Sequence, residues 1–506
     1  MATGDRTYIA DKNTLDKVYE EVRKISIAVF NAQSFDWGTL FKSRETGELF
    51  STKFYKQSVS SSAIGEKMND SVGLSCTPST ETVKGTDDFA SHNAFWFVDC
   101  DFVVNDDGTP VPTYIEGQNG FKRTGKVDVG ILTPPLFYKI EETEDSYTWH
   151  LSDKEEVNGL KLTLMPHCRN RINGEPLGYG ILPKYYAGEI DGVLCGSSGL
   201  AVKNFVSYQS LNPLMQAKGA GYFGAGSERS IFLKLMIRIK YATSSSQKIF
   251  SGCTSFNYQY KVAEASEGNY VVLAEAQAAN FYVGCTVSIG DPGTNTNYDR
   301  GQSYMRNIAD KVKVTKIDGT KVYVDSDGMT ITATSYISSM PLHSGQTDHV
   351  IGNDGYVKND GKHSFKLQGI EEGIGAYFVS CNEVFNKETA TKTVYYVKGT
   401  AGFTISLDTI KADWKELGYF ENEGSGDFWI GDIAIDEETG AEIPLTKGNG
   451  DSVGTGDRYY YGGTGTGLRE HLSRGFLRDG SIAGLSCLDG GSALSTAHWY
   501  CAACVS

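Results

Sequence analysis

The sequence has no long apolar run, and its cysteines form no dense cluster. No stretch reaches the roughly 18–20 apolar residues that span a bilayer, so we expect no membrane insertion. The first residues, MATGDRTYIADKN, have neither a basic start nor an apolar core, and no secretory signal is predicted. The ten cysteines are scattered along the chain. This pattern is typical of free thiols in a protein made in a reducing cytosol rather than of a disulfide framework.

Basic residues and proline are also scarce. Lys and Arg number 47 against 62 Asp and Glu, which gives a formal net charge of −15. A negative surface argues against nucleic acid or an anionic membrane as the main partner. The 12 prolines stand against 58 glycines, 24 Phe and 29 Tyr, a composition that favours turn-rich β structure with aromatic surfaces. The length of 506 residues indicates more than one domain.

One pair of cysteines is close in sequence, Cys501 and Cys504. A structural zinc ion needs about four ligands, and the sequence has no second CxxC or paired-His motif to supply the others. A redox CxxC usually opens a helix after a strand, whereas this one lies at the C-terminus. We therefore predict no catalytic residue, no metal site and no cofactor. The pair is interpreted as small residues of a terminal strand, with a redox pair as the alternative.

Residues 1–127 are expected to form an N-terminal assembly region. Within them, residues 11–25 predict a helix with one apolar stripe at 3-4-3 spacing. The stripe consists of Leu15, Val18, Val22 and Ile25. Its spacing matches a short coiled-coil seam, although a surface helix packed on its own domain has the same pattern. From about residue 30 the sequence indicates mixed strands and Gly/Ser loops.

The pattern becomes more regular from residue 128. VDVGILTPPLFYKIEETEDSYTWHLSD alternates apolar and polar residues on both sides of an acidic turn, which predicts a hairpin. SYQSLNPLMQAKGAG and SERSIFLKLMIRIKYATSSSQ predict two helices, the second apolar on most sides. Residues 260–345 change to a self-contained β pattern with a hairpin turn at Asp318-Gly319. We interpret them as a small domain inserted between the two parts of one domain, 128–259 and 346–506.

Five segments in the same order carry a resemblance to a known family. They are PPLFYKI, MPHC, the two predicted helices, LQGIEEGIGAYFVSCNEV and SRGFLRDGSIAGLSCLDGGSALSTAHWY. Together they resemble the C-type-lectin-like domain of phage tail and receptor-binding proteins. This is the branch related to formylglycine-generating enzymes and to the variable proteins of diversity-generating retroelements. Tyr377 and Ser380 stand where relatives often have Trp, and CAACVS replaces the customary Gly-Phe-Arg ending.

The resemblance implies an α+β fold class. The expected fold is a C-type-lectin-like domain of mixed strands with two helices, interrupted by the small β-rich insertion at 260–345. An N-terminal helix and a mixed β assembly region would precede it. The resemblance covers roughly residues 130–260 and 346–506, whereas the first 127 residues and the insertion show no sign of the family.

Residues 474–506 combine a frame of Gly, Ala and Leu with side chains that share no chemistry. In retroelement variable proteins, mutagenic copying changes AAC codons to NNC, and NNC never encodes Lys, Glu, Gln, Met or Trp. This segment contains no Lys, Glu, Gln or Met, and its one tryptophan, Trp499, stands where the family keeps a fixed aromatic residue. The resemblance therefore implies a variable ligand-binding segment. Its predicted display positions are Phe476, Arg478, Ile482, Cys487, Asp489, Ser492, Thr496, His498 and Tyr500.

Strand geometry supports this assignment. If STAHWY is a strand, Thr496, His498 and Tyr500 share one face, and Ala497 and Trp499 share the other. A large apolar Trp favours the core, so the first set is expected to face solvent. The alternatives are ordinary core roles for Phe476 and Ile482, a turn role for Asp489 and a metal or base role for His498.

These observations favour a receptor-binding protein at the tip of a phage or prophage tail, made in the bacterial cytoplasm. Its expected partners are a bacterial surface receptor (protein or glycan), other tail proteins and further copies of itself, most simply as a trimer. Because a fold does not fix a function, two alternatives stay open. One is an oxidase of the formylglycine-generating type, and the other is a purely structural tail or baseplate decoration protein.

The apolar stripe predicts a homo-oligomer, expected to be a trimer, that forms through the N-terminal region. Light scattering on the full chain should give a trimer mass at micromolar concentration. The double variant Val18→Asp and Val22→Asp should shift the mass towards the monomer, because it places charges in the seam. Glu20→Gln, off the stripe, is the matched control. A monomeric wild-type chain would contradict the prediction.

Overall fold

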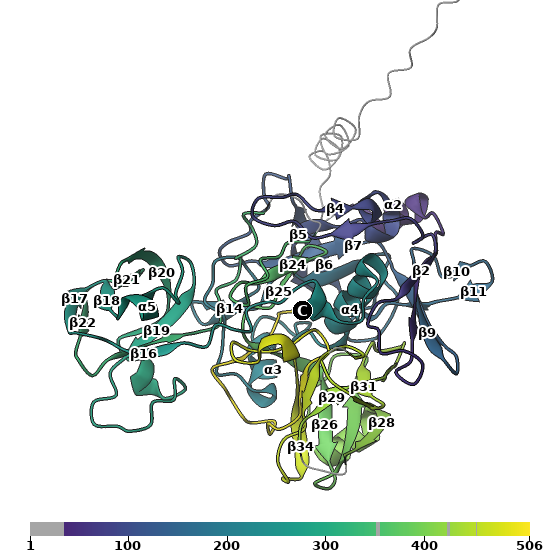
Figure 1. The fold of residues 1–506 in the computed structure, drawn as a ribbon. Helices are drawn as coiled ribbons and strands as arrows, with labels where there is room; N and C mark the ends of the chain where they lie inside the picture. Colours follow the sequence, from purple (N-terminus) through teal and green to yellow (C-terminus); the bar gives the residue numbers. More distant parts are fainter. Residues whose placement is uncertain (1–34, 351–354, 423–425, 452) are drawn as a thin grey trace, which may run out of the picture.

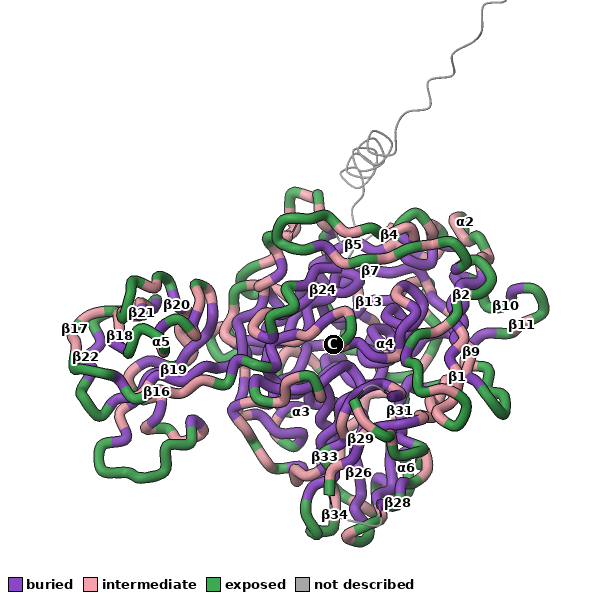
Figure 2. The backbone as a smooth tube through the Cα atoms, viewed as in Figure 1, coloured by how far each residue is buried: buried purple, intermediate pink, exposed green. Residues whose placement is uncertain are grey.

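The computed structural model describes residues 35–350, 355–422, 426–451 and 453–506, and helix α4 (Ser227–Tyr241) lies at its centre (Figure 1). All side chains from Ser227 to Lys240 are buried, and Figure 2 shows this helix as buried chain deep in the molecule. Strands β1 (Phe50–Tyr55), β9 (Ser146–Ser152) and β26 (Tyr377–Lys387) pack around it. The helix ends where Ala242 adopts a left-handed conformation, with φ of 49°.

Two antiparallel sheets form the N-terminal part of the body. One has the strand order β12-β8-β9-β1-β2, and the other has the order β13-β7-β5-β6. Their remaining strands are β2 (Glu66–Asn69), β5 (Val98–Val104), β6 (Pro110–Ile115), β7 (Asp128–Thr133), β8 (Phe137–Glu142), β12 (Thr163–Leu164) and β13 (Gly180–Pro183). Glu142 pairs with Tyr147 at the end of the β8–β9 hairpin, which confirms the predicted hairpin.

The segment that the sequence predicts as an insertion forms a six-stranded sheet of its own, at the left of Figure 1. Its order is β16-β23-β19-β20-β21-β18. The strands are β16 (Gln259–Lys261), β18 (Tyr270–Val272), β19 (Thr286–Gly290), β20 (Ala309–Asp318), β21 (Lys321–Val324) and β23 (Tyr336–Ser339). The hairpin at Asp318 is confirmed, but its loop residues are Gly319 and Thr320, because Asp318 already pairs with Lys321. Of these loop residues Gly319 has a positive φ, 57°.

A nine-stranded mixed sheet forms the lower part of Figure 1. Its main path is β28-β27-β26-β34-β35-β33-β29-β32, and the last strand of the chain pairs with β26 in parallel. Its other strands are β27 (Lys392–Val397), β28 (Lys415–Glu421), β29 (Phe428–Ile430), β32 (Lys447–Gly448), β33 (Arg458–Tyr460), β34 (Gly467–Ser473), β35 (Leu488–Asp489) and β36 (Cys501–Ala502). Strand β26 is buried along its whole length, so it forms the core of this sheet.

Shorter elements connect these sheets. The other helices are α2 (Trp37–Arg44), α3 (Tyr208–Gln216), α5 (Glu275–Ala278) and α6 (Leu407–Asp413). Two-stranded ribbons are β3 (Cys76–Thr77) with β4 (Thr86–Asp87), β10 (Glu156–Val157) with β11 (Leu160–Lys161), β14 (Gly188–Ile190) with β15 (Val193–Cys195), β17 (Ser266–Gly268) with β22 (Met329–Ile331), β24 (Phe365–Leu367) with β25 (Ile370–Glu372) and β30 (Ile433–Ile435) with β31 (Glu442–Pro444). Helices α3 and α4 confirm the two predicted helices.

The expected α+β class is wrong, because the described chain is β-rich. Strands make up 36% and helices 14% of the structure, and the strands form several curled sheets instead of a clear C-type-lectin layout. The two predicted helices are present, and residues 35–127, where the sequence indicated mixed strands and loops, form strands β1 to β6, helix α2 and short 3-10 turns. Short strands owe their stability to partners that are distant in sequence, and local patterns do not show those partners.

The N-terminal helix expected at residues 11–25, with its apolar stripe, lies outside the described residues. Among the described residues, no helix is long and apolar enough to cross a membrane.

The chain enters and leaves the insertion through two neighbouring strands. Gln259 of β16 pairs with Ser338 of β23, and Ser339 N–H donates to the Tyr258 carbonyl at 2.9 Å. Residues after β23 already contact the body, because Leu342 N–H donates to the Ile374 carbonyl at 2.8 Å. The last strand of the inserted sheet thus ends at Ser339, and the residues that follow it contact the body.

We predict that the insertion can be removed without unfolding the body. A Gly-Ser-Gly bridge from Gln259 to Ser338 should be long enough, because antiparallel partners lie only about 5 Å apart. Circular dichroism should show a folded protein with a cooperative thermal transition. The matched control replaces only the Gly319–Thr320 turn by Gly-Gly. An insoluble or unfolded deletion beside a folded control would contradict the prediction.

Candidate functional site

The segment 474–506 lies on the body as an irregular chain with short strands. It leaves β34 at Arg474, which has a positive φ of 70°, and forms a 3-10 turn at Gly480–Ile482. It then adds β35 between β34 and β33 and ends in β36 beside β26. Because it pairs with two separate parts of the nine-stranded sheet, both ends of the segment are fixed.

A buried ion pair network holds the start of the segment. Glu372 of β25 forms an ion pair with Arg229 of α4, and Arg474 Nε lies 3.4 Å from the same carboxylate. The Tyr186 hydroxyl donates to the other oxygen of Glu372. Arg474 also donates to the Leu485 carbonyl at 3.0 Å, across the loop that contains the 3-10 turn. The nearby cations hold the pKa of Glu372 below its usual value against the opposing effect of burial.

Asp457 holds the middle of the segment. Its carboxylate accepts hydrogen bonds from the N–H groups of Gly484 at 2.6 Å and Ser486 at 2.8 Å. Ser246 Oγ accepts a third from Leu485 N–H, at 2.8 Å. A Cβ atom on Gly484 would clash with the Asp457 carboxylate and with Ser246 Oγ, so this position requires glycine. Burial raises the pKa of Asp457 to about 7.

Four of the predicted display side chains stack in one row, here called the aromatic ladder: Arg478, Phe476, Tyr500 and His498. The Arg478 guanidinium carbon lies 4.9 Å from the centroid of the Phe476 ring. The rings of Phe476 and Tyr500 are stacked at 4.4 Å, and those of Tyr500 and His498 at 4.5 Å. Such contacts between rings contribute about 0.5–1.5 kcal/mol each beyond the area they bury. The structure therefore brings together residues that the sequence separates by more than one loop.

The predicted display positions differ in exposure. Arg478 is exposed, whereas Ile482, Ser492, Thr496, His498 and Tyr500 are half-buried. The expectation that every display side chain faces solvent is wrong for Phe476, Cys487 and Asp489, which are 4%, 4% and 8% exposed. Phe476 is covered because it packs between Arg478 and the rings of Tyr377, Trp499 and Tyr500. Cys487 and Asp489 are covered because their segment becomes part of the sheet at β35.

The expected strand at residues 495–500 is also wrong. The chain there makes only an isolated bridge between His498 and Val206 and then turns. The strict alternation of faces therefore fails, and Ala497 is exposed rather than buried with Trp499. The inward orientation of Trp499 is confirmed, because it is only 7% exposed. Asn204 Nδ2 donates to the Trp499 carbonyl at 2.8 Å and fixes this turn.

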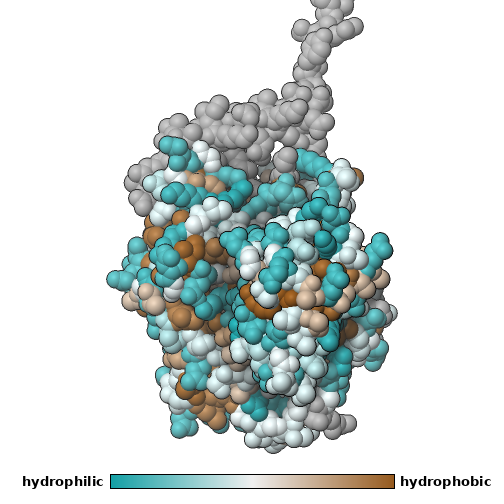
Figure 3. Space-filling model, turned by 90° about the vertical axis from the view of Figure 1, so that its left-hand side faces the viewer, coloured by the Kyte–Doolittle hydropathy of each residue, from teal (hydrophilic) through white to brown (hydrophobic). Residues whose placement is uncertain are grey.

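The insertion forms one wall of the candidate site, which the sequence did not indicate. The Arg300 guanidinium carbon lies 4.7 Å from the centroid of the Trp499 ring. Arg300 Nη1 also donates to the Ser339 carbonyl at 2.7 Å, so the cation is fixed in place. Burial lowers the pKa of Arg300 to about 10. Figure 3 shows the face that carries the insertion as mostly hydrophilic, with scattered apolar patches.

Tyr377 is a second residue that the sequence analysis did not assign to the site. Its ring centroid lies 5.2 Å from that of Phe476 and 5.9 Å from that of Tyr500. Its place in the segment where relatives often have Trp was the available signal. Tyr377 belongs to β26, so the aromatic ladder rests on the most buried strand of the sheet.

The titratable groups of the site favour neutral forms. Burial raises the pKa of Asp489 to about 7, although Gly491 N–H donates to its carboxylate at 2.7 Å. Burial also lowers the pKa of His498, with Asp299 of the insertion acting in the opposite direction. Arg478 is therefore the main fixed charge that the ladder presents to solvent.

The cysteine pair lies in the core of the protein. Cys501 and Cys504 are free thiols, each 0% exposed, and burial raises the pKa of Cys504 to about 12. Both lie in the core beside β26, which agrees with the interpretation as small residues of a terminal strand. Within the described ranges, no group of three or more His, Cys, Asp or Glu residues could hold a metal ion.

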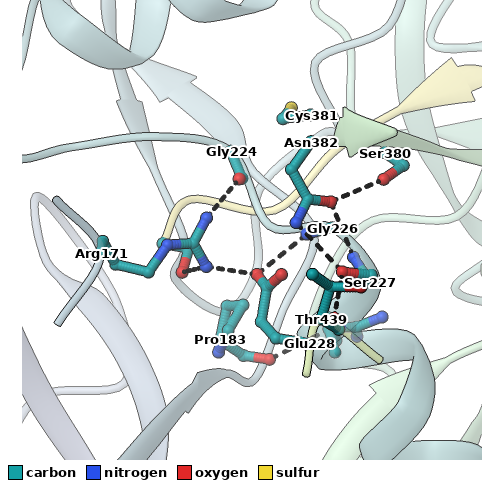
Figure 4. Close-up of polar contacts among 12 residues, drawn as sticks. Arg171, Pro183, Gly224, Gly226, Ser227, Glu228, Ser380, Cys381, Asn382 and Thr439 are labelled. Carbon is teal, nitrogen blue, oxygen red and sulfur yellow. Dashed lines mark hydrogen bonds and ion pairs between the residues drawn. The ribbon is translucent and has the colours of Figure 1, made fainter. Parts of the chain in front are cut away.

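The end of the chain is fixed at the N-terminal end of α4, where Figure 4 shows the polar contacts. Arg171 donates to Glu228 at 2.5 Å and to Ser506 Oγ at 3.2 Å. Ser227 N–H donates to Asn382 Oδ1 at 2.9 Å, which joins α4 to β26. These contacts make the last residues part of the body, and they position Trp499 and Tyr500 just before β36.

Comparison of the chain with protein-family models and with curated proteins gives no match. The resemblance to retroelement variable proteins therefore stays a prediction.

Asp489→Asn should change the pH dependence of stability. The folded pKa of Asp489 is about 7, above the roughly 3.9 of an unfolded Asp, so the folded state binds the extra proton. This contribution to stability is full below about pH 4 and is lost as pH rises towards 7. The variant should match wild type near pH 4 and exceed it at pH 8, on the order of 4 kcal/mol in the free energy of unfolding. Urea melts at both pH values measure this difference.

The control for this experiment is Asp413→Asn, at an exposed position in α6. It should follow the wild-type pH profile. Identical profiles for Asp489→Asn and wild type would show that Asp489 is ionised in the folded protein.

Proposed function

We propose that this chain is a receptor-binding protein of a phage or prophage tail, whose segment 474–506 displays a ligand-binding surface diversified by a retroelement. The observation that carries the proposal is the aromatic ladder. Three rings and a guanidinium, all of which NNC codons permit, stack side by side on a frame held by buried hydrogen bonds. The proposal rests on this segment and not on the α+β class, which the structure overturns.

The ladder has the chemistry of a protein-recognition surface. Rigid aromatic rings supply contact area at low entropic cost, and small polar residues such as Ser492 and Thr496 adapt to different partners. Arg and Tyr are also the residue types that dominate binding energy at interfaces. The proposed ligand is a bacterial surface molecule, protein or glycan, and the proposed location is the virion tail tip. If the chain assembles as a trimer, clustered sites raise avidity by about 10²–10⁴.

The frame explains how such a segment can tolerate variation. Arg474, Gly484 and Trp499 are held by contacts to Glu372, Asp457 and Arg300, none of which belongs to the segment. Replacing a ladder side chain leaves these contacts in place. Variation at the exposed end of the ladder therefore costs little stability, since solvent-facing changes usually stay within about 0.5 kcal/mol.

The other functions receive less support from the geometry. Oxidase chemistry of the formylglycine-generating type needs a reactive cysteine pair in a pocket, whereas Cys501 and Cys504 are buried and burial raises the pKa of both thiols. A purely structural decoration protein would have no need of a mixed, partly exposed aromatic row. The genome distinguishes these functions: a reverse transcriptase gene and a near-copy of the 3′ end that differs at adenines would favour the proposal.

The proposal predicts opposite effects for ladder and frame substitutions. Arg478→Ala, His498→Ala and Tyr500→Ala should each weaken binding to target cells, by about 2 kcal/mol for the dominant positions. The unfolding free energy should change by about 1 kcal/mol or less for Arg478→Ala and His498→Ala, whose side chains are exposed or half-buried. Tyr500→Ala should cost more, because it loses ring contacts to Phe476, Tyr377 and Trp499 that contribute about 0.5–1.5 kcal/mol each. Whole-cell binding and thermal melts, measured on the same variants, test both effects.

Frame variants are the matched controls. Trp499→Ala should cost about 3–5 kcal/mol of stability because it leaves a cavity. Leu485→Ala and Leu488→Ala should also destabilise, and Gly484→Ala should be poorly tolerated because of the clash with Asp457. If His498→Ala and Tyr500→Ala melted the protein while Trp499→Ala left it intact, the proposed display surface would be refuted.

A further inference from the structure

The body has a cavity that no residue of segment 474–506 lines. It is open to solvent, measures about 810 Å³ including its mouth, and lies between strands β1, β8 and β9 and the β30 ribbon. Its walls combine apolar groups with a few polar ones, the usual composition of a small-molecule site. The residues that matter here are Phe54, Ile140, Gln57, Ser60, Asp432 and Arg238.

Arg238 of α4 supplies a buried cation to this cavity. It is only 3% exposed, and its guanidinium carbon lies 4.3 Å from the centroid of the Trp149 ring. Its one hydrogen bond runs from Nη1 to the Lys234 carbonyl, at 3.3 Å. Among the described residues, no carboxylate forms an ion pair with Arg238. The guanidinium can make five N–H donations in a planar fork, so most of its capacity is unused.

The nearest carboxylates do not compensate this charge. Glu442 attracts Arg238, but its ion pair is with Lys234, at 2.7 Å. Asp457 also attracts it, but burial raises the pKa of Asp457 to about 7 and its oxygens accept backbone N–H groups of the variable segment. Within the described residues, neither Glu442 nor Asp457 therefore forms an ion pair with Arg238. Burying an uncompensated charge is costly, and proteins normally avoid it.

A second donor at the cavity also lacks a partner. Gln57 Nε2 is buried and makes no hydrogen bond within the described part of the chain. Its backbone N–H donates to Asp432 Oδ1 at 3.1 Å, which fixes the residue at the wall of the cavity. The unsatisfied carboxamide of Gln57, together with the Arg238 guanidinium that no described carboxylate pairs with, is complementary to an acceptor-only anion such as a carboxylate.

We propose that this cavity binds an acidic sugar, whose carboxylate pairs with Arg238 and Gln57. The Ser60 hydroxyl and the Asp432 carboxylate line the same cavity and suit the hydroxyl groups of a sugar ring. Phe54 and Ile140 provide apolar wall for its C–H face. The site is independent of the aromatic ladder and of the variable segment's proposed receptor.

Calorimetric titration of the full chain with D-glucuronate tests the proposal. Glucuronate should bind, and D-glucose, which lacks the carboxylate, should bind at least tenfold more weakly. Benzoate, a carboxylate without hydroxyl groups, should also bind at least tenfold more weakly than glucuronate. Equal binding of glucose and glucuronate, stronger binding of benzoate, or no binding of glucuronate would each overturn the proposal.

Two variants test the roles of the donors. Arg238→Met should reduce glucuronate affinity at least tenfold while the melting temperature stays equal or rises, because it removes an uncompensated buried charge. Gln57→Leu should also reduce the affinity, and it decides the outcome if Arg238→Met does not fold. Arg478→Met removes a cation from the ladder and should leave glucuronate binding unchanged. Wild-type affinity in Arg238→Met or Gln57→Leu would overturn the assignment of the donors.

Discussion

The ion pair between Arg229 and Glu372 is the interaction on which the rest of the structure depends. Both side chains are 0% exposed, so either charge alone would be strongly destabilising inside the core. The pair joins the central helix to β25, and Arg474 shares the same carboxylate. Through the Glu372 carboxylate, helix α4, the β24–β25 ribbon and the start of segment 474–506 become parts of a single core. The position of the candidate site therefore depends on the ion pair that Arg229 of α4 makes in the core.

Contacts to groups outside segment 474–506 also distinguish the frame residues from the ladder residues. Frame residues make contacts to groups outside the segment, such as Asp457 and Arg300, so their energy depends on atoms that do not vary. Ladder residues contact mainly one another, Tyr377 and the neighbouring frame residue Trp499. Neighbouring side chains of the ladder are therefore energetically coupled, and the effect of one substitution depends on which residue stacks beside it. Variation on this surface changes an arrangement of side chains rather than a set of independent positions.

Local patterns in the sequence predicted the elements whose stability is local. The four-residue spacing of Ile231, Leu235 and Ile239 indicated α4, and alternation around an acidic turn indicated the β8–β9 hairpin. The sequence also indicated that Trp499 is buried. It gave the covered position of Phe476 only as an alternative, and it did not indicate that the chain turns after His498 or that the insertion reaches the site. Each of these depends on a contact with a residue distant in sequence, and the predicted α+β class was wrong for the same reason.

The buried cations of α4 differ in whether a carboxylate pairs with them. Arg229, Lys234 and Lys240 each have a carboxylate partner: Glu372, Glu442 and Asp87. Arg238 lies on the same helix at similar depth and pairs with no carboxylate of the described residues, although Trp149 covers one face of its guanidinium. The other buried charges of this helix are paired, and leaving the Arg238 charge unpaired adds nothing to the stability of the chain. The exception coincides with a cavity and with a second unsatisfied donor, Gln57, so the missing partner is best explained as a ligand that is not part of the chain.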